Sequence, residues 1–392
     1  MHARLLLRHC VAAAFGTFLT TTAAAQVPNV RVAGRVQVQY RAAGGDSTAT
    51  FNTGAVNNGF EVRRLRIQTD VRFGDNITLV IQPSFEMGAL RMRDAFLRVG
   101  LSPRFGVTLG QEKSPFQRYE LNSSNNLPSI ERGVRILGLG QKEALNDLLS
   151  NNGYASHDLG AFVDFAAPEN KVTLKVGVQN GSRESSADVN EAKSFFGRAT
   201  AIVATNADDQ PALQVGASFA ARDRGICQTL GTSTSMCTAY YPDSSKKTTA
   251  FGLDFELGGF RPGWHAIADF ATGDNVPAAT RKATGRNTGN LDSASAPIVT
   301  FIGVHVVGAY RIATTGPDTR LVKTIEPALR IDYTDPNTDV DDDQGILVTP
   351  VINVYFGNTV VLRAGLDFYS YTDAAGDGHT AREFKVSWQA NF

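Results

Sequence analysis

Apolar and polar side chains alternate at every second position along most of the chain. The clearest segments run from Lys171 to Gln179, from Thr248 to Leu257 and from Leu362 to Tyr369. Alternation puts successive side chains on opposite faces of a strand, so each segment predicts a β-strand with one apolar and one polar face. No long segment repeats with the 3.6-residue period of a helix. We therefore predict an all-β protein.

Short turn motifs and longer connections rich in Asn, Ser, Asp and Gly take turns between the strands. One connection, Met87–Ala89, is brief where a long one is due, and Lys113–Ser156 is then the third long loop. A helical turn is expected inside that loop, around Glu143–Leu149. About 16 strands fit between the breaks, starting near Arg31, Glu61, Ile77, Arg91, Val107, Asp158, Lys171, Phe195, Leu213, Thr249, Trp264, Thr300, Val322, Ile346, Thr359 and Arg382.

An even number of strands, with turns on one rim and loops on the other, is typical of a transmembrane β-barrel. In lipid each unpaired backbone N–H or C=O costs several kcal/mol, and only a closed ring leaves no strand edge. A ring of about 16 strands is too wide for its own side chains to fill. The sequence thus predicts one domain, residues 26–392, that forms a 16-stranded antiparallel barrel around an aqueous lumen.

Both ends of the chain agree with export to a bacterial outer membrane. Arg4 and Arg8 precede an apolar run, and small residues follow up to Ala25, which predicts a cleaved signal peptide over residues 1–25. The final strand alternates without a slip and ends on Phe392, a pattern that the barrel-insertion machinery recognises in this class. Outer-membrane lipid and lipopolysaccharide are the expected surroundings.

Two cysteines remain in the exported chain, Cys227 and Cys237, within a stretch of Gly, Thr and Ser. In an oxidising compartment they predict a disulfide that closes a surface loop. No His or third Cys lies nearby to complete a metal site. The alternating acidic residues of Asp335–Asp343 lack the Gly and Glu that a calcium loop requires, so we predict a solvated loop there. No metal and no cofactor are expected.

Charge is balanced over the whole chain but unevenly distributed. Residues 26–135 hold 15 Lys and Arg against 9 Asp and Glu, whereas residues 136–392 hold 21 against 29. A nucleic-acid-binding domain would be more strongly basic, so nucleic acid is not an expected partner. A basic first third predicts a local path for anions.

Several motifs in that first third resemble one porin family. They are Gly34–Tyr40, Phe60–Ile67, Leu90–Leu97, Gly110–Phe116 and Leu121–Leu127 with Glu131-Arg132. Together they resemble the opening strands and the G-Q-x-K-x-P-F block of the phosphate-selective porin O and P family. Glu112 stands where a Phe is common, and Gly133 replaces a Ser. The recognisable motifs cover about residues 30–165.

The resemblance implies a homotrimeric outer-membrane porin whose third long loop folds into the lumen. Known members line their narrow zone with arginines and lysines that hold phosphate, so small anions such as phosphate are the implied solutes. Lys113, Arg118 and Arg132 fall in the loop or at its ends. A guanidinium offers a planar fork matched to phosphate oxygens, and Lys offers a point charge.

Strand parity adds wall residues to this set. Arg on the lipid face near the midplane costs about 2–4 kcal/mol, so the arginines of the first two strands should face the lumen. Arg63 breaks the alternation and predicts a bulge or a rim position. The parity of the fourth strand does not decide which set lines the pore. The wall candidates for anion conduction are Arg31, Arg35, Arg64, Arg66, Arg72, Arg91 and Arg93.

Three alternatives stay open. The arginines can oppose carboxylates across the lumen, with Asp70, Glu86, Asp94, Glu112 and Glu131 as partners, which gives a mixed and weakly selective pore. The barrel can be plugged and serve as an anchor or receptor. It can also be a hydrolase, although the chain has no H-E-x-x-H, G-x-S-x-G or Walker motif.

The histidines are expected to be ordinary residues, His157, His265 and His305 in strands and His379 in a loop. Trp264, Tyr310, Phe356 and Tyr371 are expected in the interfacial girdles. The reading that fits best is a diffusion porin, not an enzyme.

Overall fold

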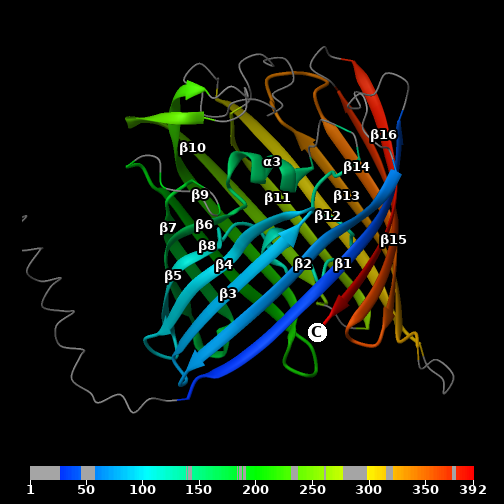
Figure 1. Ribbon diagram of the computed structural model, residues 1–392, viewed down its shortest axis with the longest axis horizontal. Helices are drawn as coiled ribbons and strands as arrows, with labels where there is room; N and C mark the ends of the chain where they lie inside the picture. Colours follow the sequence, from blue (N-terminus) through cyan, green and yellow to red (C-terminus); the bar gives the residue numbers. More distant parts are fainter. Residues whose placement is uncertain are drawn as a thin grey trace, which may run out of the picture.

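The computed structural model is a closed antiparallel barrel (Figure 1). It describes residues 27–45, 58–137, 139, 144–182, 184, 188, 191–230, 237–259, 262–276, 298–314, 321–372 and 377–392. Each strand pairs with its neighbours in sequence, and β1 pairs with β16 to complete the ring of 16 strands in this part of the chain. The predicted fold class is confirmed.

The strands begin within a few residues of the predicted positions, with one exception discussed below. Their bounds are β1 Asn29–Gly45, β2 Asn58–Phe73, β3 Ile77–Glu86, β4 Ala89–Gly100, β5 Phe105–Lys113, β6 His157–Ala166, β7 Val172–Gln179, β8 Ser194–Thr205, β9 Pro211–Leu230, β10 Cys237–Leu257, β11 Gly263–Asn275, β12 Val299–Ala313, β13 Thr324–Asp335, β14 Gly345–Phe356, β15 Val360–Thr372 and β16 Gly378–Asn391. The helical segments are α2 Arg118–Leu121, α3 Leu145–Asn152 and the 3₁₀ turn η1 Pro168–Asn170. None of these helices is long and apolar enough to cross a bilayer.

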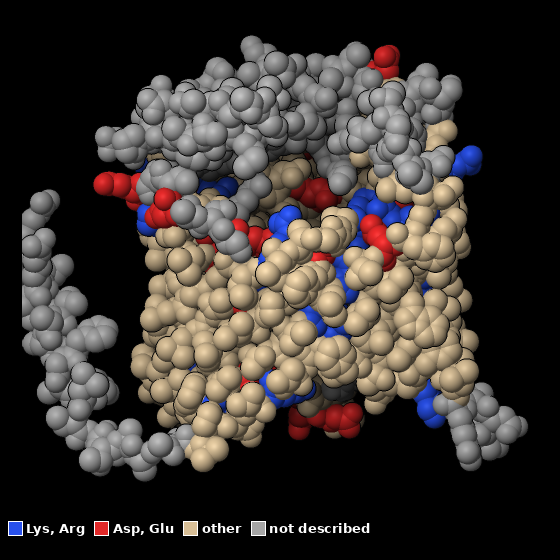
Figure 2. Space-filling view, viewed as in Figure 1, with Lys and Arg blue, Asp and Glu red and all other residues tan. Residues whose placement is uncertain are grey.

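The two faces of the wall differ as the alternation predicts. In β10, Phe251 and Leu253 are more than half exposed on the outside, whereas Asp254 and Glu256 are buried inside. In β16, Trp388 is exposed and Ser387 and Gln389 are fully buried. Figure 2 shows the lower part of one side of the wall mostly tan, with charged side chains gathered in a recess below the upper rim. The outer face is thus an apolar band that suits lipid.

The seam between the first and last strands closes the ring at the chain terminus. Gly34 donates its N–H to the carbonyl of Phe392 at 2.8 Å, and Phe392 returns a bond to the carbonyl of Gly34 at 2.9 Å. A Cβ on Gly34 would overlap the Phe392 ring and lie 2.8 Å from the carbonyl oxygen of Arg66. Close approach of three strands therefore requires glycine at this position.

Residues 114–156, called loop L3 below, connect β5 to β6 and fold into the lumen. Phe116, Tyr119, Leu127, Leu148 and Tyr154 in this loop are at most 2 % exposed. The expected helical turn is present as α3, whose C-cap Gly153 has a φ of 75°. The prediction that the third long loop enters the barrel is confirmed.

Three predictions about individual positions were wrong. The tenth strand begins at Cys237 rather than near Thr249, because β9 and β10 continue as a long paired ribbon beyond the rim. Tyr371 is not a girdle residue: it is 2 % exposed and stacks on Tyr369 inside the barrel, with ring centroids 5.0 Å apart. His379 lies in β16 and not in a loop.

Two further predictions concern parts that the structure does not describe. The signal peptide, residues 1–25, lies outside the described residues, and so do the side chains of Cys227 and Cys237. The cleavage site and the disulfide therefore stay predictions.

The seam generates a test. We expect Gly34→Val to destabilise the closed barrel by about 1–3 kcal/mol or more, because the added side chain overlaps the Phe392 ring. The measurement is the temperature at which the folded band disappears on a semi-native SDS gel. Gly59→Val is the matched control, since a Cβ at Gly59 has no heavy atom within 4 Å. Equal melting of both variants would contradict this account of the seam.

Candidate functional site

Loop L3 is attached to the barrel wall at β13, β15 and β1, where arginine side chains donate hydrogen bonds to its backbone carbonyls. Arg330 of β13 donates Nη1–H to the carbonyl of Glu131 at 2.7 Å and also reaches that of Arg132. Arg363 of β15 donates to the carbonyl of Asn125 at 2.9 Å. Arg41 of β1 donates to the carbonyl of Arg135 at 2.6 Å. These bonds satisfy loop carbonyls that the infolding removes from water.

Side chains from the wall also receive the loop. Asp269 of β11 accepts the backbone N–H of Tyr119 at 3.1 Å, and Asn353 of β14 donates to the carbonyl of Pro128 at 2.8 Å. Arg118 forms an ion pair with Glu256 of β10. The wall strands that hold L3 through these contacts therefore include β10, β11 and β13–β15, together with β1.

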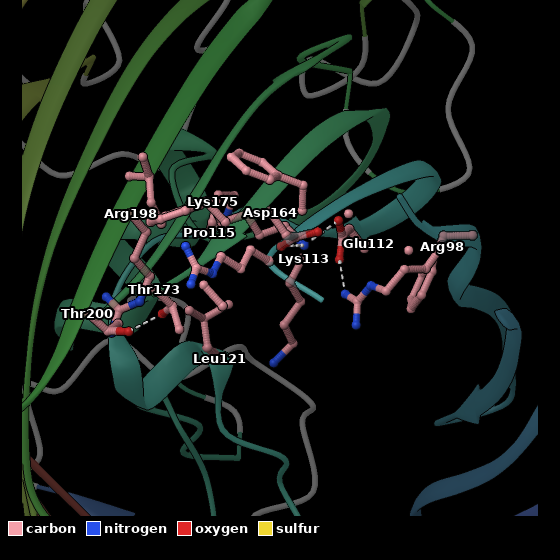
Figure 3. A pocket seen from close by; sticks show the side chains of 18 of the residues that line it. Arg98, Glu112, Lys113, Pro115, Leu121, Asp164, Thr173, Lys175, Arg198 and Thr200 are labelled. Atoms are coloured by element: carbon pink, nitrogen blue, oxygen red, sulfur yellow. Dashed lines mark hydrogen bonds and ion pairs between the residues drawn. The ribbon is translucent and has the colours of Figure 1, made fainter. Parts of the chain in front are cut away.

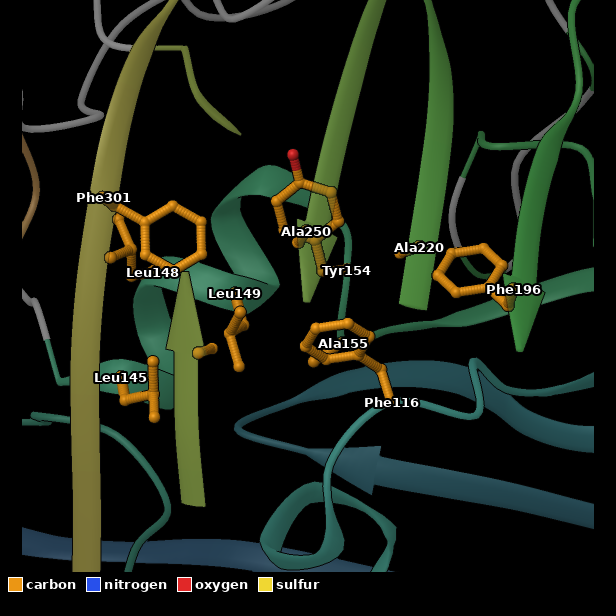
Figure 4. Packing of buried hydrophobic residues seen from close by; sticks show 11 residues of the cluster. Phe116, Leu145, Leu148, Leu149, Tyr154, Ala155, Phe196, Ala220, Ala250 and Phe301 are labelled. Carbon is orange, nitrogen blue, oxygen red and sulfur yellow. The ribbon is translucent and has the colours of Figure 1, made fainter. Parts of the chain in front are cut away.

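Apolar contacts support the same arrangement. Phe116, Leu148, Leu149 and Tyr154 of L3 pack against inward-facing residues of β8–β12, namely Phe196, Ala220, Ala250, Ala271 and Phe301 (Figure 4). Near the upper rim, residues of L3 pack against β14–β16, with Val134, Ile136, Leu139 and Ala144 meeting Leu347, Tyr369, Tyr371 and Ala381. This second cluster explains why Tyr371 points inward, because Tyr371 belongs to the apolar surface against which L3 packs.

L3 packs against the β8–β16 side of the lumen, and two cavities lie on the opposite side, along β2–β8. The upper cavity, of about 500 Å³, is bounded by β2–β5, L3 and Glu184. The lower cavity, of about 620 Å³, is bounded by β4–β8 and the turn at Ser102–Arg104. Lys113 lines both cavities.

Most of the cations predicted to conduct anions line the upper cavity. Among its described lining residues, Lys and Arg outnumber Asp and Glu by eight to five. The cations are Arg63, Arg64, Arg66, Arg91, Arg93, Lys113, Arg132 and Arg135, and the acids are Glu86, Glu120, Glu131, Asp147 and Glu184. The lining is therefore net positive although carboxylates are present.

Two β-bulges concentrate the arginines there. The register of β1 against β2 shifts between Gln37 and Val38, so Arg63 is an extra residue in β2, and Arg63 and Arg64 both face the lumen. A second shift, between Gln82 and Pro83 of β3, makes Arg93 the extra residue of β4. A bulge places two consecutive side chains on one face. The bulge answers the question that the parity of the fourth strand left open, because Arg93 and Asp94 of β4 both face the lumen.

Carboxylates hold the arginines in fixed positions. Glu131 of L3 accepts bonds from Arg63 Nε at 2.6 Å and from Arg64 Nη2 at 2.8 Å. Glu86 pairs with Arg93 at 2.5 Å and with Arg66, and Glu184 pairs with Arg91 at 2.9 Å. Arginines of the wall therefore do pair with carboxylates, as the alternative of a mixed and weakly selective pore requires. Even so, the Nε atoms of Arg64 and Arg93 are buried and have no hydrogen-bond partner among the described residues.

A second ion cluster lies at the junction of the two cavities. Lys113 Nζ is 3.2 Å from Glu120 Oε1, Arg132 Nε is 3.5 Å from Glu120 Oε2, and Asn146 donates to Glu120 at 2.8 Å. Burial alone would raise the pKa of Glu120, but the charges of Lys113 and Arg132 outweigh it and lower this pKa to about 2. Glu131 lies in the same loop. Burial alone would raise its pKa, but the charges of Arg63 and Arg64 of β2 outweigh burial and hold this pKa well below its ordinary value. Both loop carboxylates are ionised at neutral pH.

The lower cavity continues the positive lining toward the turn rim. Arg98, Arg104, Lys113, Lys175 and Arg198 line it together with Asp94, Glu112 and Asp164. Figure 3 shows Glu112 between Lys175, at 2.7 Å, and Arg98, at 4.0 Å. Arg98 is about half exposed, so its guanidinium remains accessible to a solute.

Six of the ten predicted cations meet at the upper cavity: Arg64, Arg66, Arg91, Arg93, Lys113 and Arg132. The other four do not line it. Arg35 is the cross-strand neighbour of Arg66, but it is buried against L3 and donates to Ser124 at 2.6 Å. Arg118 pairs with Glu256, and Arg31 and Arg72 are exposed near the turn rim of β1 and β2.

Several lining residues were absent from the predicted set. Arg135 follows Arg132 by three positions in the same loop, and Lys175 lies on the polar face of the clearest alternating strand, so both had a usable signal. Arg98 shares a parity with Asp94. The bulge at Arg93 kept the alternation from showing that this parity faces the lumen. Glu184 belongs to the fourth long connection, and nothing in the sequence places it beside Arg91.

A closed lipid-compatible barrel with an infolded loop and a charged lumen defines an outer-membrane porin. The sequence pattern of one family, described as phosphate-selective porin O and P, matches residues 30–234, which is more than half of the chain. The protein therefore belongs to the phosphate-selective porin O and P family, as the resemblance of its opening strands implied. No curated protein sequence matches the chain.

Solved structures share the fold at low sequence identity. The anion-selective porin from Comamonas acidovorans is 10 % identical, with a TM-score of 0.57 over 93 % of this chain and 100 % of that chain. The outer-membrane channel DcaP of Acinetobacter baumannii is 12 % identical, with a TM-score of 0.56 over 93 % and 97 %. OmpT of Vibrio cholerae is 11 % identical, with a TM-score of 0.54 over 94 % and 98 %.

The attachment of L3 can be tested at Arg330. We expect Arg330→Met to release the loop carbonyls of Glu131 and Arg132 and to leave Asp332 with one partner fewer, which costs about 3–5 kcal/mol for a broken buried pair. Single-channel recording should then show larger current fluctuations than in the unaltered protein. Arg72→Met, at an exposed wall arginine, is the control. Steady currents in Arg330→Met would show that L3 does not depend on this anchor.

The ion cluster at Glu120 predicts a pH dependence. A carboxylate whose pKa is lowered in the folded protein stabilises it above the ordinary pKa, and this contribution is lost as the pH falls through the lowered value. Since the pKa of Glu120 falls from 4.5 to about 2, its ion pairs should persist from neutral pH to about pH 4 and weaken below about pH 3.

Single-channel conductance measured over this range checks the expectation. Glu120→Gln removes the carboxylate at every pH and should show the acid behaviour already at neutral pH. A change in the unaltered protein between about pH 6 and pH 4 would argue against the assignment.

Proposed function

We propose that this porin conducts small anions in preference to cations along the β2–β8 side of its lumen, and that phosphate is among its solutes. The observation that carries the proposal is the upper cavity, with eight Lys and Arg against five Asp and Glu among its described lining residues. A narrow passage with a net positive lining raises the local concentration of anions and repels cations.

An accessible guanidinium in this cavity supports an oxyanion as solute. Arg91 keeps about half of its side chain exposed, although one of its nitrogens pairs with Glu184 at 2.9 Å. Arginine N–H groups at fixed positions can replace part of the hydration shell of a phosphate. Lys113, between the two cavities, supplies a further point charge on the path.

The descriptions of related proteins support an anion-conducting porin. The matching family is described as phosphate-selective, and one neighbour of the same fold is described as an anion-selective porin. A trimer form is recorded for Vibrio cholerae OmpT, and we propose a homotrimer for this chain as well. We further propose export through the signal peptide at residues 1–25, insertion through the Phe392 terminus, and no enzymatic activity.

Planar-bilayer recording in a KCl gradient tests the ion preference. We expect a reversal potential that reports anions, and Arg93→Gln with Lys113→Gln should reduce the anion preference roughly twofold or more. Lys171→Gln is the control, because Lys171 lies on the turn rim outside both cavities and pairs with Glu169. A reversal potential of the opposite sign would refute the anion preference, and the absence of unit conductance would favour a plugged barrel.

Phosphate is tested in the same recordings. Millimolar phosphate should reduce the chloride current, and Lys113→Gln or Arg132→Gln should weaken the block while Lys171→Gln leaves it unchanged. Chloride current that phosphate does not affect would leave an anion porin without a phosphate site. A block that is identical in all three variants would discard these two residues as its origin.

A further inference from the structure

Arg382 is an outward-facing cation in the wall of the barrel. It lies in β16, where its neighbours in the alternation, Thr380 and Phe384, are also exposed, whereas Glu383 and Lys385 are buried inside. No hydrogen bond or ion pair joins the Arg382 side chain to any described residue. The cations of the upper cavity, in contrast, are held by carboxylates. The Arg382 guanidinium therefore has donors available for an anionic group outside the chain.

The wall beside Arg382 is hollowed. A groove of about 430 Å³ lies there, and its lining includes Ile346, Val348, Phe368, Ser370, Thr380 and Arg382. On β1 the residue opposite Arg382 is Gly44, which has no side chain to cover that side of the described wall. On the other side Phe368 and Ile346 are nearly half exposed. The groove is therefore mostly apolar, with the hydroxyl groups of Ser370 and Thr380 in its lining and one cation at its edge.

The height of Arg382 places it near the outer face of the membrane. Ten residues separate it from Phe392 at the turn rim, and a strand tilted near 45° climbs roughly 23 Å over ten residues at about 3.3 Å each. The apolar band of such barrels is about 25 Å tall. Arg382 thus lies at the level where acyl chains end and polar headgroups begin, on the side of the long loops.

We propose that this groove binds a phosphorylated, acylated lipid of the outer leaflet, with an acyl chain against Phe368 and Ile346 and a phosphate on Arg382. Charge complementarity is the argument. The planar guanidinium matches phosphate oxygens, and the apolar groove directly beside it matches a hydrocarbon chain. The proposal rests on the outer-membrane location and is independent of the anion preference of the lumen.

Native mass spectrometry of the purified protein in detergent tests the site with diphosphoryl lipid A as the probe. The unaltered protein should retain bound lipid A, and Arg382→Gln should lower the retained fraction at least tenfold. Ser370→Phe keeps the charge but fills the groove, and it should have a similar effect. Lys323→Gln removes one exposed positive charge at the turn rim and is the matched control, which should bind as the unaltered protein does.

The headgroup requirement is tested with dephosphorylated lipid A, which should be retained much less than the diphosphoryl form. Equal retention of both lipids, or equal binding by Arg382→Gln and the unaltered protein, would overturn the proposal. If Arg382→Gln instead converts an oligomer to monomers with lipid binding intact, the groove is a subunit contact and the proposal is wrong. Retention of unit conductance in the variants shows that the barrel is folded in each case.

Discussion

The position of loop L3 is fixed by hydrogen bonds from wall arginines to its backbone carbonyls, and the conducting space depends on that position. A loop inside a barrel loses part of its hydration, so its carbonyls need other donors. Arg330, Arg363 and Arg41 supply them from three different strands. With L3 held on that side, the two cavities that contain most of the predicted cations lie along β2–β8. Arginine therefore has two roles in this lumen: one set seats the loop, and another lines the space that the loop leaves.

The fold was predictable because one constraint acts on every strand. Charge is costly on the lipid face near the bilayer midplane, so each strand has a favoured parity there, as Arg64 and Arg66 in β2 illustrate. Prediction failed where this constraint is locally absent. The ribbon of β9 and β10 extends beyond the rim, where alternation is not required. Tyr371 faces inward because L3 provides an apolar surface there, a contact between segments far apart in the sequence.

The candidate site was predictable only in part, for related reasons. Arg35 and Arg66 are cross-strand neighbours with the same inward parity, but Arg35 is buried against Ser124 of L3, whereas Arg66 lines the cavity. The path of L3 decides between them, and no periodicity encodes that path. The family pattern is also altered at two positions. Glu112, where a Phe is common, pairs with Lys175. Gly133, where a Ser is common, leaves room for the carboxylate of Asp147, which accepts the backbone N–H of Val134 at 2.5 Å.

The carboxylates of the upper cavity do not cancel its positive character. A guanidinium and a carboxylate in direct contact form a dipole, whose field falls with distance faster than that of a net charge. The pairs of Glu131 with Arg63 and Arg64, at 2.6 and 2.8 Å, mainly fix the arginines in place. The excess of three cations over anions then leaves the described lining net positive. Since the screening length is about 8 Å at physiological salt, that excess acts across a passage of this size. Rigid pairing and net charge are thus compatible: the acids position the guanidinium groups, and the surplus of cations sets the sign of the field that a solute meets.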